Sequence, residues 1–154
     1  MYWSDTYASA PLYRGKLGEL YFPMELEGKK VQTTISPSDR FTTLTTDVTR
    51  LFYGFDESSP GVEAEREADD VTYHYRAMQL TAPGLTVSNA KIRLRKPQKG
   101  CQLELPARRT SGAGYECMGA HPMKLGRNVL QKLRLYFATK EKRLYFTSAE
   151  AGRT

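Results

Sequence analysis

Residues 20–35 read LYFPMELEGKKVQTTI, and no other stretch of the chain predicts its fold as directly. Residues 20–26 alternate well enough to form a β-strand, and residues 31–35 are rich in the β-branched side chains that favour strands. The four residues between them, Glu27-Gly28-Lys29-Lys30, are polar and include a glycine, which is typical of a tight turn. We therefore expect a β-hairpin here.

Further strand patterns follow this hairpin along the chain. Four more runs are expected to be strands: residues 41–44, 71–80, 85–87 and 90–94. The last two are expected to be separated by a corner at Ser88-Asn89. Strands spaced by polar turns predict an all-β fold.

Two short helices are expected within this β pattern. Residues 46–52 predict a helix that begins at a Thr46 cap. Asn128 is expected to cap a second helix over residues 129–133, which leads into a hairpin formed by residues 135–138 and 143–147.

The length and composition are those of one globular domain. The chain has 154 residues, of which 40% are hydrophobic and 26% charged, with ten Tyr and six Phe. No apolar run approaches the ~20 residues that span a bilayer, and the first ten residues lack the apolar run of a secretion signal. We expect a lead-in or linker over residues 1–16, one domain over 17–148 and a tail over 149–154.

The formal charge of +6 raises the question of a nucleic-acid partner. Such a partner requires Lys and Arg gathered on one face, with aromatic residues among them. Here the basic clusters lie in four separate places, at residues 29–30, 93–96, 108–109 and 140–143. We interpret them as solvated charges and expect no nucleic acid, so a basic nucleic-acid-binding domain is only the second alternative.

Two cysteines, Cys101 and Cys117, flank a glycine-containing segment. They can close it with a disulfide, which stabilises a loop of this size by about 3 kcal/mol, or stay as buried free thiols. A metal site would need both cysteines with His121 and His74, and their spacing matches no zinc pattern, so we expect no metal and no cofactor. Paired cysteines predict a periplasmic or secreted protein, and free thiols predict a cytoplasmic one.

Three stretches resemble the single-lobe, retropepsin-like aspartic proteases of bacteria and retroelements, in the family's order and over most of the chain. Residues 20–31 look like the family's first hairpin, and Gln32-Thr33-Thr34-Ile35 looks like the strand that carries its catalytic Asp-Thr-Gly. Leu125-Gly126-Arg127-Asn128-Val129-Leu130 resembles the family's Leu-Gly-x-Asp/Asn-x-Leu motif, and residues 133–147 resemble its closing hairpin. The resemblance implies an all-β single lobe, a closed or partly open β-barrel with one or two short helices.

The resemblance fails at the catalytic motif, where Ser36, Pro37 and Ser38 replace Asp-Thr-Gly. The family's chemistry needs two carboxylates that share a proton, one from each lobe or subunit, and a serine hydroxyl replaces neither. Ser38 also adds a Cβ where the family has glycine, and Pro37 removes a backbone N–H. We therefore expect no catalytic residue, and a pseudoprotease domain for peptide binding or protein assembly.

Asp39 carries the first alternative, an active aspartic endopeptidase that uses this carboxylate instead. A shift of three residues moves the group by several ångströms, which is more than catalysis tolerates. The resemblance also places the family's flap near residues 56–75, so Val71, Tyr73 and Tyr75 are expected to contact a peptide. The expected partner is a peptide or protein, and both a homodimer and a second lobe of a longer chain are left open.

Overall fold

The chain forms a mostly β protein, described by a computed structural model at residues 8–15, 17–67, 70–82, 85–104, 114–115 and 120–148. Its strands are β1 (Ala8–Pro11), β2 (Tyr13–Arg14), β3 (Leu20–Leu26), β4 (Lys29–Ile35), β5 (Thr42–Thr45), β6 (Glu63–Glu67), β7 (Asp70–Ala82), β8 (Leu85–Arg95), β9 (Leu103–Glu104), β10 (Gly114–Tyr115), β11 (Met123–Leu125), β12 (Leu133–Ala138) and β13 (Arg143–Ser148). Helix α1 (Thr46–Val48) continues into a π-helical turn, η1 (Thr49–Tyr53), and helix α2 (Arg127–Leu130) follows β11. Among these residues, no helix is long and apolar enough to span a bilayer.

The hairpin predicted at residues 20–35 is present as β3 and β4. Its turn consists of Glu27 and Gly28, which have positive φ angles of 49° and 89°. Positive φ at both central positions is typical of a type I′ turn, whose twist matches that of the paired strands. The turn is shorter than the predicted four residues because Lys29 and Lys30 already pair with β3.

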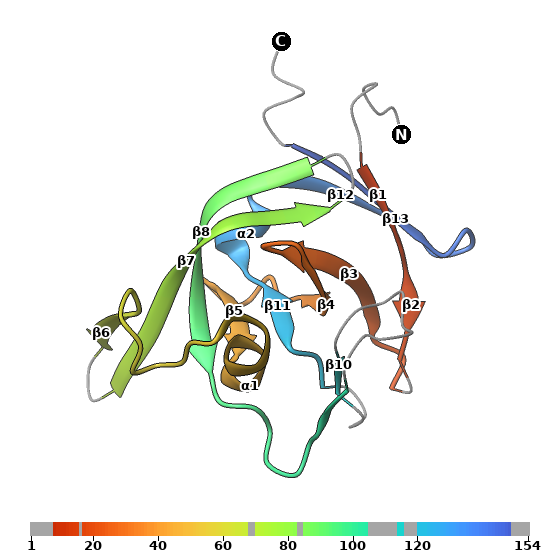
Figure 1. Cartoon of the computed structure of the whole chain (residues 1–154). Helices are drawn as coiled ribbons and strands as arrows, with labels where there is room; N and C mark the ends of the chain where they lie inside the picture. Colours follow the sequence, from red (N-terminus) through yellow and green to blue (C-terminus); the bar gives the residue numbers. More distant parts are fainter. Residues whose placement is uncertain are drawn as a thin grey trace.

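The main sheet closes into a barrel. Its strand order is β2-β3-β4-β11-β5-β8-β7-β6, and β3 also pairs with β7, with Glu25 opposite Thr81 and Leu26 opposite Leu80. The strands β3, β4, β11, β5, β8 and β7 therefore form a ring (Figure 1). Alternate side chains point into this ring and form the buried core, which includes Phe22, Met24, Val31, Leu44, Ile92 and Leu125.

Strand β11 lies between β4 and β5, although β4 and β5 follow one another along the chain. It runs parallel to β4 and antiparallel to β5. Residues 36–41, which join β4 to β5, must therefore cross the end of β11. We call these residues the crossing loop.

A second sheet, at the top of Figure 1, has the order β1-β13-β12. Strands β12 and β13 form the predicted closing hairpin. Strands β1 and β2 lie within residues 1–16, where the sequence predicts a lead-in or linker, and they pair with β13 and β3. Their own residues show no sustained strand period, because these short strands are set by pairing with distant partners rather than by local pattern.

Three local expectations are wrong. The N-cap of α1 is Thr45 rather than Thr46, and the buried Thr46 hydroxyl has no hydrogen-bond partner among the described residues. Ser88-Asn89 is not a corner, because β8 continues through it with Asn89 at a φ of 58°, a conformation that Asn tolerates. Asn128 does not cap α2, whose N-cap is Gly126.

Asn128 instead connects three elements of the barrel. Its Oδ1 accepts hydrogen bonds from the backbone N–H and the hydroxyl of Thr42, at 2.8 and 3.0 Å. Its Nδ2 donates to the backbone carbonyl of Lys91 at 2.8 Å. The side chain therefore ties α2 to β5 and β8, beside the crossing loop.

Replacing Asn128 with Ala should lower the free energy of unfolding by roughly 2–3 kcal/mol, because three partly buried hydrogen bonds are lost. Urea-induced unfolding measures this change. Gln131→Ala, at an exposed position one turn away, is the control and should change stability by less than about 0.5 kcal/mol. Equal stability of the two variants would contradict the role given to Asn128.

Candidate functional site

The crossing loop is held by backbone hydrogen bonds to the elements beside it. The Ser36 N–H donates to the Leu125 carbonyl at the end of β11, at 2.8 Å. The Arg127 N–H, at the start of α2, donates to the Asp39 carbonyl at 2.8 Å. Side chains at positions 36–38 take no part in these two backbone bonds.

Gly126 lets this loop lie directly on the chain between β11 and α2. A Cβ at this position would lie 2.3 Å from the carbonyl carbon of Phe41 and 2.7 Å from the backbone nitrogen of Thr42. Contacts that short are far inside van der Waals distance, so only glycine fits here. The glycine of the family-like motif therefore has a packing role.

Ser36, Pro37 and Ser38, which the resemblance predicts to replace the catalytic motif, lie in a turn of the crossing loop. Pro37 and Ser38 are exposed, and Ser36 is half-buried. The Ser36 hydroxyl donates to Asp39 Oδ2 at 2.6 Å, and the Asp39 N–H donates to the Ser36 carbonyl at 3.0 Å. The Asp39 carboxylate is thus directed back onto its own turn.

A pocket of about 450 Å³ opens beside Ser36, and we call it the Ser36 pocket. Its lining comes from strands that are distant in sequence: Glu19, Leu20, Thr34, Ile35, Ser36, Lys124 and Phe137. Asp39 does not line it. The pocket joins apolar walls to a few polar groups, which is typical of a site for a ligand side chain.

Cross-strand register places several polar side chains on one outer row of the barrel. Lys124 is paired with Thr34 of β4 and with Thr43 of β5, and Thr43 is paired with Arg93 of β8. Paired residues point to the same face of a sheet. The row Thr34–Lys124–Thr43–Arg93 therefore faces outward, opposite the core.

Part of this outer face is covered by the connection that follows β8. The Tyr115 hydroxyl lies 2.6 Å from both Thr45 Oγ1 and Asp47 Oδ1. Since a hydroxyl has one proton to donate, it donates to the carboxylate and accepts from Thr45. Burial, together with the bond to Asp47, raises the pKa of Tyr115. Asp47 therefore anchors β10.

A buried histidine joins the same connection to the start of β3. His121 Nε2 lies 3.0 Å from Glu19 Oε2, its Nδ1 lies 3.2 Å from Gln32 Oε1, and its ring packs on Tyr21 at a centroid distance of 4.6 Å. Burial acts to raise the pKa of Glu19, but hydrogen bonds from His121 and from the backbone N–H groups of Glu19 and Leu17 outweigh it and hold this pKa below its usual value. The Glu19 carboxylate, on the wall of the Ser36 pocket, is therefore already hydrogen-bonded within the protein.

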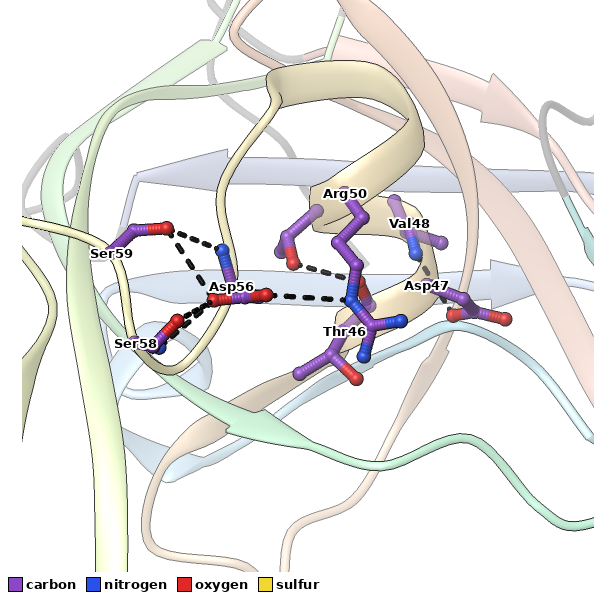
Figure 2. Close-up of polar contacts among 8 residues, drawn as sticks. Thr46, Asp47, Val48, Arg50, Asp56, Ser58 and Ser59 are labelled. Atoms are coloured by element: carbon purple, nitrogen blue, oxygen red, sulfur yellow. Dashed lines mark hydrogen bonds and ion pairs between the residues drawn. The ribbon is translucent and has the colours of Figure 1, made fainter.

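The turn between η1 and β6 is organised by Asp56 (Figure 2). Its Oδ1 accepts from the Ser58 hydroxyl at 2.7 Å and from the Ser58 N–H at 2.9 Å, and its Oδ2 lies 3.7 Å from Arg50 Nε. The Asp56 N–H donates to the Ser59 hydroxyl at 2.9 Å. These bonds fix the turn from which the β6–β7 hairpin projects (Figure 1).

The three residues expected to contact a peptide lie on one face of β7. Val71 is exposed, Tyr73 is half-buried against the core, and Tyr75 is 8% exposed and packs edge-to-face on Phe55 with centroids 4.7 Å apart. None of the three lines the Ser36 pocket. Their contact with a peptide stays a prediction, and Val71 is the most exposed of the three.

The cysteines and histidines do not form a metal centre in the described part of the chain, where no three His, Cys, Asp or Glu side chains lie close enough to hold an ion. Cys101 is disulfide-bonded. Cys117 lies outside the described residues, so its pairing with Cys101 stays a prediction. His74 lies 3.0 Å from the Thr72 hydroxyl, away from His121 and its partner Glu19.

The fold is similar to a solved structure. A crystal structure of a retropepsin-like aspartic protease from Rickettsia conorii matches with a TM-score of 0.59 at 15% sequence identity, over 95% of this chain and 96% of that chain. No protein-family model and no curated protein matches the sequence. The comparison confirms the retropepsin-like β-barrel fold that the sequence predicts, across nearly the whole chain.

The sequence alone identified Ser36 but not the other walls of its pocket. Glu19 directly precedes β3, Lys124 lies in β11 and Phe137 lies in β12, and only the tertiary fold brings them together. One signal was available for Lys124. A lysine between Met123 and Leu125 indicates a strand with one outward-facing charge.

Glu19→Gln should reduce stability at neutral pH, because it removes a carboxylate that is held ionised by its hydrogen bonds. A folded-state pKa below the unfolded value contributes stability above the unfolded pKa, and this contribution is lost as the pH falls through the folded pKa. The difference between native chain and variant should therefore shrink on acidification, as measured by urea unfolding across pH. Glu63→Gln, at an exposed carboxylate of β6, is the control and should show no such convergence. A Glu19→Gln deficit that is constant with pH would count against this account.

Proposed function

We propose that this chain is a non-catalytic, retropepsin-like domain that binds an extended peptide. The observation that carries the proposal is the place of Ser36, which lines a pocket at the position where the resembling proteases carry their aspartate. A pocket lies beside this position, but a hydroxyl stands where the proteases have the carboxylate that takes part in peptide cleavage. A ligand can be bound there without being cleaved.

The chemistry of the turn supports this proposal. An aspartic protease uses two carboxylates that share one proton, so that one activates water while the other protonates the carbonyl oxygen. The Ser36 hydroxyl gives its proton to a hydrogen bond with Asp39. Asp39 does not replace the missing group, because its carboxylate accepts that bond and does not line the pocket.

An extended peptide is the ligand that this architecture suits. Peptides add to β-proteins by pairing their backbone with an available strand, and pockets for alternate side chains then provide selectivity. The Ser36 pocket is large enough for one side chain and has apolar walls from Leu20, Ile35 and Phe137. The β6–β7 hairpin lies in the region where the family has its flap.

Assembly with a second copy is the second candidate function, and strand β12 favours it. Among the described strands, β12 is an edge strand of its sheet, which has the order β1-β13-β12. Tyr136, in the middle of this strand, is 44% exposed. A strand edge of this kind is a template for pairing with another chain, and a two-fold axis through it would give a closed homodimer.

The native chain should not cleave a peptide library at any pH from acid to neutral. The expected result is an absence of pepstatin-sensitive products by mass spectrometry, for the native chain and for Asp39→Asn alike. Both proteins should bind members of the library. A triple variant Ser36→Asp, Pro37→Thr, Ser38→Gly serves as the matched comparison for the turn.

Pepstatin-sensitive cleavage by the native chain that Asp39→Asn abolishes would overturn the proposal in favour of an active endopeptidase. Failure of the native chain to bind any peptide would also overturn it. Cleavage by the triple variant but not by the native chain would agree with the proposal. It would mean that the fold can support cleavage and that the native chain lacks only the carboxylate.

For assembly, sedimentation velocity should show a concentration-dependent dimer that Tyr136→Lys weakens, since a charge on an exposed strand edge disfavours pairing. Lys140→Glu, in the exposed β12–β13 turn, is the control and should leave the dimer unchanged. A native chain that stays monomeric at high concentration would exclude the β12 dimer without affecting peptide binding.

A further inference from the structure

We propose that the Ser36 pocket selects an acidic side chain, Asp or Glu, of the bound peptide, and that Lys124 is the residue that selects it. This inference rests on the proposed peptide binding and names the class of peptide. It follows from Lys124, a charged group of the pocket that has no counterion among the residues that the structure describes.

Lys124 is placed in the pocket by the alternation of β11. Its neighbours Met123 and Leu125 are 0% and 1% exposed and point into the barrel. Lys124 therefore points to the opposite face, where it is half-buried and lines the pocket. With the described residues, its side chain forms neither a hydrogen bond nor an ion pair.

The other charged residue of the pocket is already engaged. One oxygen of Glu19 lies 3.0 Å from His121 Nε2, and the other accepts from the Leu17 N–H at 3.1 Å. Both Glu19 oxygens therefore already accept hydrogen bonds, which leaves Lys124 as the charged side chain of the pocket that can pair with a ligand. Because the walls formed by Leu20, Ile35 and Phe137 exclude water from one side, a carboxylate beside Lys124 is attracted more strongly than it would be in bulk solvent.

A second cation lies in the same outer row. Arg93 is half-buried, stands two strands from Lys124, and has no ion-pair partner among the described residues. Strands are about 4.8 Å apart, so these positions are separated by roughly 10 Å. Together with the formal charge of +6, this row favours an acidic peptide over a neutral or basic one.

The test uses three pools of N-acetylated, C-amidated decapeptides with a fixed central Glu, Gln or Lys among randomised neighbours. Fluorescence anisotropy measures the affinity of each pool for the native chain, Lys124→Met and Lys124→Glu. Lys132→Met, at an exposed lysine after α2, is the matched control. Thermal melting verifies that each variant is folded.

The native chain and Lys132→Met should bind the Glu pool about fivefold more tightly than the Gln pool, the size expected of a partly exposed ion pair. Lys124→Met should bring the two pools to equal affinity, and Lys124→Glu should favour the Lys pool. The native preference for Glu should also fall as salt is added, a measurement that needs no variant.

Equal binding of the Glu and Gln pools by the native chain, or a Glu preference that survives in folded Lys124→Met, would overturn the acidic selection while leaving peptide binding intact. Should Lys124→Met not fold, a native Glu preference that is insensitive to salt would overturn it. Absence of binding to every pool would overturn the proposed function itself, which separates the two failures.

Discussion

The fold depends on the insertion of β11 between β4 and β5. Two strands that are consecutive in the chain are held one strand apart, so the six residues between them must pass over the end of a third strand. Backbone hydrogen bonds from Ser36 to Leu125 and from Arg127 to Asp39 fix that passage. Gly126 supplies the space for it, and Asn128 ties the adjacent helix to β5 and β8.

This constraint explains how the crossing loop keeps its place with Ser36, Pro37 and Ser38 in its turn. The bonds that hold the crossing loop use main-chain atoms: a carbonyl, which every residue provides, and an N–H, which every residue except proline provides. Ser36-Pro37-Ser38 therefore occupies the turn without disturbing the neighbours that define it, and the hydroxyl of Ser36 closes the turn locally on Asp39. A change of the side chain at position 36 would leave these backbone bonds in place, whereas loss of Asn128 would remove hydrogen bonds between elements.

Local signals in the sequence predicted what local forces determine. The β3–β4 hairpin was predictable because alternation and a Glu27-Gly28 turn act over a few residues. Asn128 was misread as a helix cap because an Asn before an apolar run fits that pattern, while its real partners are 86 and 37 residues away. Strands β1 and β2 were not predicted for the same reason, since they are defined by pairing with β13 and β3. The Ser36 pocket combines β3, β4, β11 and β12, so its charge pattern became visible only in the folded chain.

The presence of Lys124 in the Ser36 pocket bears on which chemistry the site suits. A pair of catalytic carboxylates must keep one shared proton at the working pH, which requires that their environment disfavour full ionisation. A nearby cation does the opposite, because it lowers the pKa of a carboxylate and favours loss of that proton. The same cation favours binding when the carboxylate belongs to a ligand that must bind in its ionised form. A pocket that pairs Ser36 with Lys124 is thus better matched to holding an acidic group than to sharing a proton between two of its own.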